Sequence, residues 1–212
     1  MIVPLLKKWG IQTLVSDEKL IVRLGDSFES VASMEMYDRF SVGKIGEEYA
    51  AISQPSWSSV QKTTVQANAL ISSPYGVDRF CEGTKVPAII RCSREELDST
   101  ILIAGAYERI FEPLTNIAKK HGITLRYGNH KQSSALAHLQ NNSAHLSCFA
   151  GADTLPDGNF VPIPLAVSPA GDTIFLVKRA DAPVNELVET LFALAKSDEF
   201  VKGASTLGYH VC

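Results

Sequence analysis

The sequence lacks most of the features that identify a function directly. Its four cysteines, Cys81, Cys92, Cys148 and Cys212, form no Cys-x-x-Cys pair, so we expect free thiols rather than a zinc framework. No apolar run is long enough to span a bilayer. The stretch at 1–9 does not follow the signal-peptide pattern, because its lysines come after the apolar residues. We therefore expect a cytoplasmic protein with no membrane partner, and leave open whether a leader or domain precedes it.

Basic charge is also scarce. The chain has 20 Lys and Arg against 23 Asp and Glu, a formal net charge of −3. A general nucleic-acid surface would need clustered cations, and we do not expect one. With 45% hydrophobic residues the chain predicts a packed core rather than disorder. A length of 212 residues fits one α/β domain or two small lobes.

Catalytic motifs are missing as well. The sequence has no Gly-x-Ser-x-Gly, Walker loop, Gly-x-Gly-x-x-Gly or His-Glu-x-x-His pattern, so we predict no catalytic residue and no cofactor. His138 and His145 are seven residues apart, but Asn141 and Asn142 interrupt the helix that would align them. We interpret the histidines as solvated or core residues and predict no metal site.

What the chain does contain is one pattern that occurs twice. An apolar run at 19–24 is followed by Gly25 and an amphipathic stretch at 28–40, and a run at 101–104 is followed by Gly105 and a stretch at 107–120. The pattern predicts two strands that each lead into a helix, with Asp26 and Glu29 as a capping box. Helix N-termini expose backbone N–H groups that bind anions. Two such units suggest two lobes with a ligand between them.

The second half is the clearer part. Apolar patterns predict strands at 101–104, 123–127, 144–149, 160–165 and 172–178, and helices at 107–120, 133–140, 183–196 and 198–203. A helical turn at 93–97 would have Ser93 as its cap, and residues 42–51 fit a helix. This alternation predicts an α/β fold with mostly parallel sheets flanked by helices, and ligands at the carboxyl ends of the strands.

Four residues are candidate ligand contacts. Ser133 and Ser134 begin the helix at 133–140, where hydroxyl and N–H groups bind a carboxylate or oxyanion, although Ser133 is equally suited to be an N-cap. Ser27 has the same position in the first unit, where the charge of Asp26 favours capping over anion binding. Tyr107 offers a phenol, although tyrosines at such positions more often belong to the core.

A competing pattern lies at 42–71. The stretch Ile52-Ser-Gln-Pro-Ser56 resembles the start of the recognition helix in bacterial helix-turn-helix regulators. That helix would contain Trp57 and one cation, Lys62, which is few for phosphate contacts. DNA is a partner only if this motif is real.

From residue 101 onward the chain resembles type II periplasmic-binding proteins and the related effector domains of LysR-type regulators, in the stretches 132–146, 160–179 and 184–209. The resemblance implies a two-lobed fold, with lobe I at 1–90, lobe II at 91–165 and a closing strand and helices at 166–212. It further implies a sensor or effector domain that binds a small anionic molecule. A DNA-binding regulator and an enzyme acting on a carboxylated metabolite are the alternatives, and a homodimer stays open.

Overall fold

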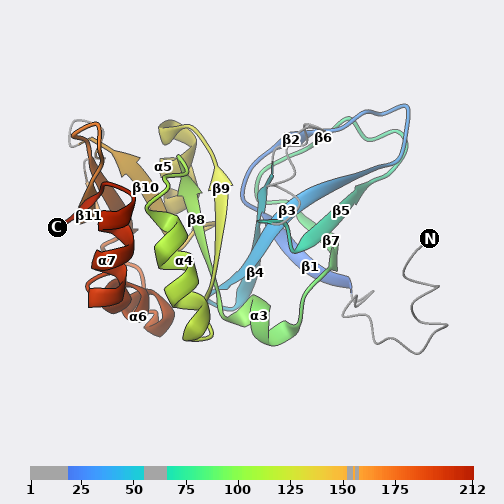
Figure 1. The fold of residues 1–212 in the computed structure, drawn as a ribbon. Helices are drawn as coiled ribbons and strands as arrows, with labels where there is room; N and C mark the ends of the chain where they lie inside the picture. Colours follow the sequence, from blue (N-terminus) through green and yellow to red (C-terminus); the bar gives the residue numbers. More distant parts are fainter. Residues whose placement is uncertain (1–18, 55–65, 152–154, 156–157) are drawn as a thin grey trace.

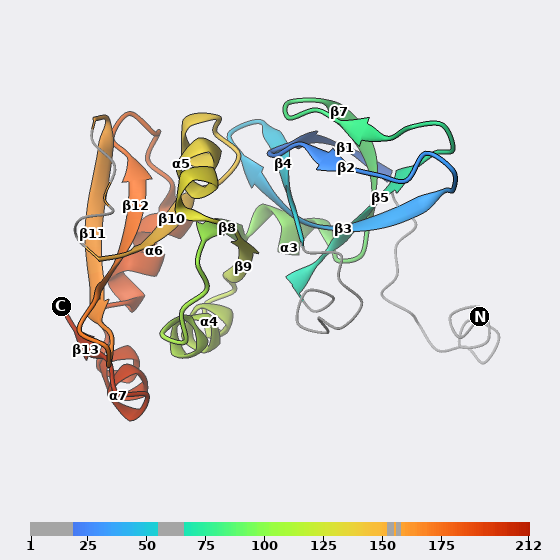
Figure 2. The same ribbon diagram turned by 90° about the horizontal axis from the view of Figure 1, so that it is seen from above.

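The structure is a computed structural model that describes residues 19–54, 66–151, 155 and 158–212 (Figure 1). Within these residues the chain forms a β-barrel followed by an α/β sheet (Figures 1 and 2). The barrel part contains β1 (Lys19–Leu24), β2 (Phe28–Glu29), β3 (Met36–Ile45), β4 (Glu48–Ser53), β5 (Ala69–Ser73), β6 (Arg79–Phe80) and β7 (Lys85–Ile90). Helix α3 (Arg94–Asp98) leads into the second part.

The barrel is closed by five strands in the order β1-β4-β3-β5-β7, and β7 returns to pair with β1. The strands pair antiparallel except β1 with β4. Alternate residues such as Val22, Leu24, Phe40 and Val42 point inward and are fully buried, as the two-residue period of strands requires. Closure satisfies the backbone groups that an open edge would expose.

The second part is a six-stranded sheet with helices on both faces. Its strands lie in the order β13-β11-β12-β10-β8-β9, in which β9, β8 and β10 are parallel and the remaining pairs antiparallel. Its elements are β8 (Thr100–Gly105), α4 (Phe111–Lys120), β9 (Thr124–Asn129), α5 (Gln132–Gln140), β10 (Leu146–Ala150), β11 (Phe160–Val167), β12 (Thr173–Arg179), α6 (Glu186–Leu194), α7 (Asp198–Thr206) and β13 (His210–Val211).

Strand β8 shows how the two faces differ. Ile101 and Ile103 pack into the core that α4, α6 and α7 cover, whereas Leu102 and Ala104 pack against α5 and against barrel strand β4. The barrel and α5 therefore lie on the same face of the sheet, side by side (Figures 1 and 2). The surface between them is where the two halves of the chain meet.

Polar contacts also join the barrel to the sheet. The Gln54 side chain donates to the carbonyl of Tyr127 at 2.7 Å. Arg126 on β9 forms a 2.6 Å ion pair with Glu96 of α3, and Arg23 on β1 donates to the carbonyl of Asn142 at 2.7 Å. Hydrogen bonds to charged groups that are partly shielded from water contribute more than exposed ones, so these contacts hold the two parts in one arrangement.

The predicted two-lobed, mostly parallel fold of the periplasmic-binding-protein type is wrong. The described residues contain 40% strand and 24% helix, with one lobe replaced by a closed barrel and a second sheet that is mixed. The expected boundary at residue 165 falls inside β11, which pairs with β12 in the same sheet.

The predicted helices at 28–40 and 42–51 are also wrong, because this region forms β2, β3 and β4. Strand β3 pairs with β5 over Met36–Phe40 and with β4 over Phe40–Ile45, so Phe40 has a paired strand on both sides. The described part of the expected helix-turn-helix at 42–71 is thus mainly strand. Ile52 and Ser53, where the recognition helix was expected to start, end β4, and residues 55–65 lie outside the described residues.

Candidate metal centre

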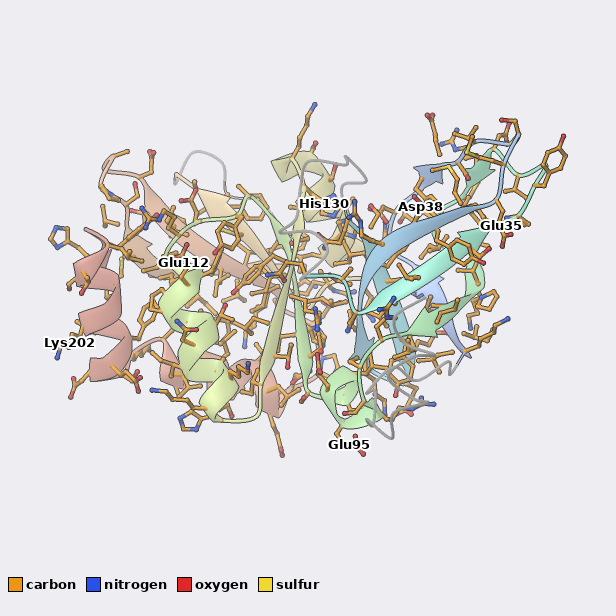
Figure 3. All side chains as sticks on the ribbon, turned by 45° about the vertical axis from the view of Figure 1, so that its right-hand side comes forward. Glu35, Asp38, Glu95, Glu112, His130 and Lys202 are labelled. Atoms are coloured by element: carbon orange, nitrogen blue, oxygen red, sulfur yellow. The ribbon has the colours of Figure 1, made fainter. Side chains whose placement is uncertain are left out.

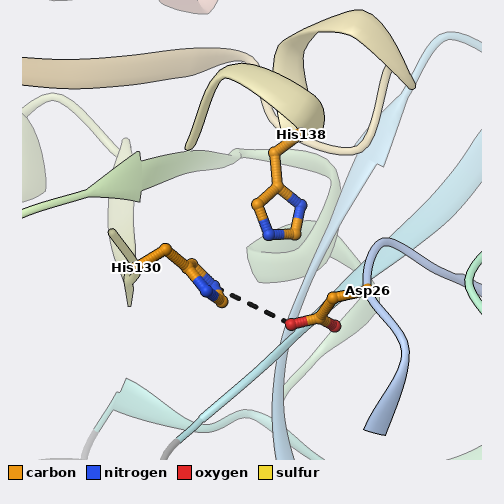
Figure 4. A group of neighbouring side chains, drawn as sticks. All are labelled: Asp26, His130 and His138. Carbon is orange, nitrogen blue, oxygen red and sulfur yellow. Dashed lines mark ion pairs between the residues drawn. The ribbon is translucent and has the colours of Figure 1, made fainter. Parts of the chain in front are cut away.

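Three side chains from the two parts of the chain meet at their junction (Figure 4). Asp26 follows β1, His130 follows β9, and His138 belongs to α5. One ligand atom from each lies within 4.8 Å of the other two. We refer to Asp26, His130 and His138 as the triad. More than a hundred residues separate Asp26 from the two histidines in the sequence, so only folding brings the triad together.

Two glycines, Gly25 and Gly128, allow the barrel and the sheet to approach closely at the triad. A Cβ atom added to Gly25 would lie 2.7 Å from Cβ of Ser143, and one added to Gly128 would lie 2.5 Å from Cγ2 of Ile52 and 2.7 Å from Nε2 of His130. No side chain fits at these distances. The residue before Asp26 and the residue two before His130 are therefore glycines because the barrel and the sheet touch there.

Asp26 is held by Ser53 at the end of β4. The Ser53 N–H donates to Oδ1 of Asp26 at 3.2 Å, and the Ser53 hydroxyl donates to Oδ2. Burial raises the pKa of the Asp26 carboxyl, while the Ser53 hydrogen bonds and the nearby imidazole of His130 oppose this rise. Burying the charged form of the Asp26 carboxyl costs free energy, and a bound cation would offset that cost.

His138 has a defined tautomer. Its Nδ1 lies 2.9 Å from the Ser143 hydroxyl, and that hydroxyl donates its only proton to the backbone carbonyl of His138 at 3.1 Å. Ser143 must therefore accept the hydrogen bond from Nδ1–H, which leaves the lone pair on Nε2. Burial, together with a smaller effect of the neighbouring His130, lowers the pKa of His138 to about 3. The ring is thus neutral at physiological pH and able to act as a metal ligand.

The Nε2 atom of His130 is a triad nitrogen without a hydrogen-bond partner among the described residues. This nitrogen is buried and forms no hydrogen bond with the described residues. The nearest charged atom, Oδ2 of Asp26, is 3.9 Å away, which is too long for a hydrogen bond (Figure 4). Burial lowers the pKa of His130 and the Asp26 charge opposes that shift. A buried imidazole nitrogen without a partner is uncommon and calls for a ligand.

The donor set suits a cation. Atoms no more than 4.8 Å apart all lie within about 2.8 Å of a common point, and zinc binds imidazole and carboxylate at about 2.0–2.2 Å. Side-chain shifts below about 1 Å would therefore complete the coordination. Ser53 and Ser143 supply the outer hydrogen bonds that orient ligands in metal centres.

Three of the four residues predicted from the sequence, Ser27, Ser133 and Ser134, lie in segments that also carry triad residues, but none belongs to the triad. Ser27 is exposed, and its hydroxyl accepts the N–H of Glu82 at 2.9 Å. Ser133 and Ser134 are exposed in the first turn of α5, and Ser134 precedes His138 by four residues, one helical turn. The interpretation of Ser133 as an N-cap is wrong, because Lys131 occupies that position.

Tyr107 lies elsewhere. Its ring contacts Phe111 and Tyr127 beside the core under α4, on the face of the sheet opposite the triad. Burial raises the pKa of its phenol. The structure thus does not bring Tyr107 together with the serines.

None of the three triad residues is among the ligand contacts predicted from the sequence. Asp26 was assigned to a helix cap, yet no helix follows it, and the two histidines were assigned to the core or the solvent. One signal was present: Asp26 and His130 each lie within two residues of the end of a strand, where polar side chains of α/β proteins commonly gather.

A comparison of the sequence with protein-family models gives no match, and a comparison with curated proteins gives none either. Among the helices of the described residues, none is both long and apolar enough to cross a membrane. The functional interpretation therefore depends on the triad and its surroundings.

Proposed function

We propose that the protein binds one divalent transition metal ion of the zinc class through Asp26, His130 and His138, and that the ion in turn binds a small anionic ligand. The buried, unpartnered Nε2 of His130, beside the Asp26 carboxylate and the neutral ring of His138, is the observation that carries this proposal. Two imidazoles and one carboxylate are the ligands of many metal sites of this class.

The donor atoms favour some metals over others. Imidazole nitrogen suits zinc, iron, nickel and copper, whereas calcium and magnesium prefer shells made of oxygen. Three protein ligands also leave at least one coordination position for water or an anion. A carboxylate or oxyanion at that position fits the anionic ligand expected from the sequence. A sensor role and a cytoplasmic location remain part of the proposal, without the closure of two lobes.

A calorimetric titration tests the metal. Zinc added to the full chain near pH 7.5 is expected to bind with a stoichiometry of one, whereas magnesium gives no comparable signal. His130→Asn is expected to abolish the strong binding, and His121→Asn, which changes an exposed histidine outside the triad, is expected to leave it intact. Equal zinc binding by the wild type and His130→Asn would place the metal elsewhere.

Visible spectroscopy tests the anion. Cobalt(II) replaces zinc in many sites of this donor set and its absorption responds to a new ligand. Azide or acetate added to the cobalt-loaded protein is expected to change the spectrum in a saturable way. An unchanged spectrum would remove the anionic ligand from the proposal and leave the metal.

The hydroxyl of Ser143 is expected to matter although it does not bind the metal. Ser143→Ala removes the acceptor that fixes the tautomer of His138, so zinc affinity should fall by about 10- to 100-fold. Ser147→Ala is the matched control, because this buried serine donates to the carbonyl of Ala135 and does not contact the triad. Competition with a zinc-binding dye measures both affinities, and equal losses in the two variants would mean a general effect of removing a buried hydroxyl.

A further inference from the structure

Two segments distant in sequence form an extension of the barrel, made of residues 27–39 and 72–82, which we call the arm. Strands β2 and β6 pair within the arm. The backbone N–H of Ser30 donates to the carbonyl of Asp78 at 2.8 Å, and the backbone N–H of Gly76 donates to the carbonyl of Ala32 at 2.8 Å. The arm projects away from the α/β sheet, at the end of the molecule opposite α7 (Figure 1). The arm contains no triad residue, and the inference drawn from it does not depend on the proposed metal.

The arm exposes apolar side chains. Val31, Met34, Tyr37 and Tyr75 are 44%, 52%, 55% and 77% exposed, and they make up half of the eight large exposed hydrophobic residues of the described chain. The side of the arm that faces the barrel core is already occupied by Phe28, which stacks on Phe80 and contacts the ring of Phe40. The four exposed residues therefore have no place in that core. Gathered apolar side chains on a surface commonly mark a binding site.

The arm also carries the negative charge of the protein. It contains five acidic residues and two basic ones, a formal net charge of −3 that equals the net charge of the whole chain. The rest of the chain is therefore neutral overall. The acidic residues are Glu29, Glu35, Asp38, Asp78 and Glu82, and Figure 3 shows Glu35 and Asp38 in this part of the molecule.

One acidic group is positioned beside an exposed aromatic ring. Oε1 of Glu35 accepts the hydroxyl of Tyr37 at 3.0 Å and the hydroxyl of Ser72 at 2.9 Å. The carboxylate is thus fixed next to a phenol ring whose face can contact a cation. A fixed carboxylate and an aromatic ring are a common means of binding an ammonium or guanidinium group.

We propose that the arm is a docking surface for a basic segment of a partner protein, one that combines apolar side chains with Lys or Arg. The apolar residues would be covered by the partner's apolar side chains, and the acidic residues would pair with its cations. A second copy of this chain is the poorer occupant, because two arms would bring like charges together.

Fluorescence anisotropy with short labelled peptides tests the proposal on the full chain. A peptide of about ten residues made of Lys, Leu and Ser is expected to bind at least about tenfold more tightly than a Lys–Ser peptide of equal charge or a Glu–Leu–Ser peptide of equal apolarity. Met34→Ser combined with Tyr75→Ser should weaken binding about tenfold or more. Val184→Ser, at an 85% exposed valine outside the arm, should have no effect.

The charge is tested separately. Glu35→Gln is expected to weaken binding of the Lys–Leu–Ser peptide and to reduce its dependence on salt. Equal binding of the Lys–Ser peptide, insensitivity to the Met34 and Tyr75 changes, or concentration-dependent dimerisation that these changes abolish would each overturn the proposal. Sedimentation of the wild type and the double variant measures the last outcome.

Discussion

Replacing Asp26 with asparagine is expected to lower the affinity for zinc by at least about a hundredfold, since the loss of residues that merely orient a ligand already costs up to that factor. The substitution removes the only anionic ligand of the triad and changes no volume. An asparagine still offers an oxygen to the Ser53 N–H and an amide to the Ser53 hydroxyl, so the local hydrogen bonds survive.

The same variant is expected to behave oppositely without metal. Burial disfavours the charged form of Asp26 and raises its pKa, so the neutral amide should make the metal-free protein at least as stable as the wild type. Added zinc should then stabilise the wild type far more than Asp26→Asn. Urea unfolding with and without zinc measures both effects, with Asp172→Asn, at an exposed position, as the control. A variant that is equally stabilised by zinc would show that Asp26 is not a ligand.

The second large effect is a loss of stability in mild acid, to which both His138 and His145 contribute and of which the His145 part can be tested outside the triad. The partly buried ring of His145 joins the sheet to the barrel: its Nδ1 accepts the N–H of Leu102 at 3.1 Å, and its Nε2 lies 3.0 Å from the carbonyl of Lys44. Because Nδ1 is the acceptor, the single proton is on Nε2 and is donated to Lys44. A second proton would have to enter at Nδ1, where it would face the N–H of Leu102.

The direction of this pH effect on stability follows from the pKa of His145. Burial lowers the pKa of His145 to about 4, with the Lys44 hydrogen bond opposing the shift, whereas an unfolded chain has the ordinary value near 6.5. Between these values the unfolded state binds a proton that the folded state does not, so stability is complete above about pH 6.5 and falls as the pH decreases toward 4. The shift corresponds to a loss on the order of 3 kcal/mol.

His145→Gln isolates this contribution, because glutamine offers a donor and an acceptor but does not titrate. Urea unfolding at several pH values between 7.5 and 4.5 is expected to show a steeper loss of stability for the wild type than for this variant. His210→Gln, at an exposed position in β13, should retain the wild-type slope. Parallel slopes for the wild type and His145→Gln would show that His145 does not set the acid sensitivity.

The sequence predicted the second half of the fold much better than the first. Alternating apolar patterns located the strands and helices from α3 onward, and Ser93 caps α3 as predicted by accepting the N–H of Glu96 at 3.2 Å. These elements carry strong local signals, such as the single apolar side of α4. The start of α4 was less well placed, because the helix begins at Phe111 rather than at Tyr107.

The strand predicted at 19–24 is confirmed as β1, but the helices predicted at 28–40 and 42–51 were wrong because the structure there depends on distant pairing. Phe28, Val31, Ala32, Met36 and Phe40 have helical spacing, yet β3 exists because it pairs with β4 and β5. Local spacing does not reveal such pairing, and tertiary contacts override local preference. The same holds for the triad, since nothing near His130 in the sequence indicates that Asp26, more than a hundred residues earlier, lies beside it.

Nuclear magnetic resonance of the imidazole rings tests the metal site most directly. The chain has five histidines, and zinc is expected to shift the Nε2 resonances of His130 and His138 at one equivalent while those of His121, His145 and His210 stay in place. The Nδ1 proton of His138 should remain bonded to Ser143 throughout. Shifts confined to His121 or His210, or no shift at His130 and His138, would contradict a metal centre at the junction of the barrel and the sheet.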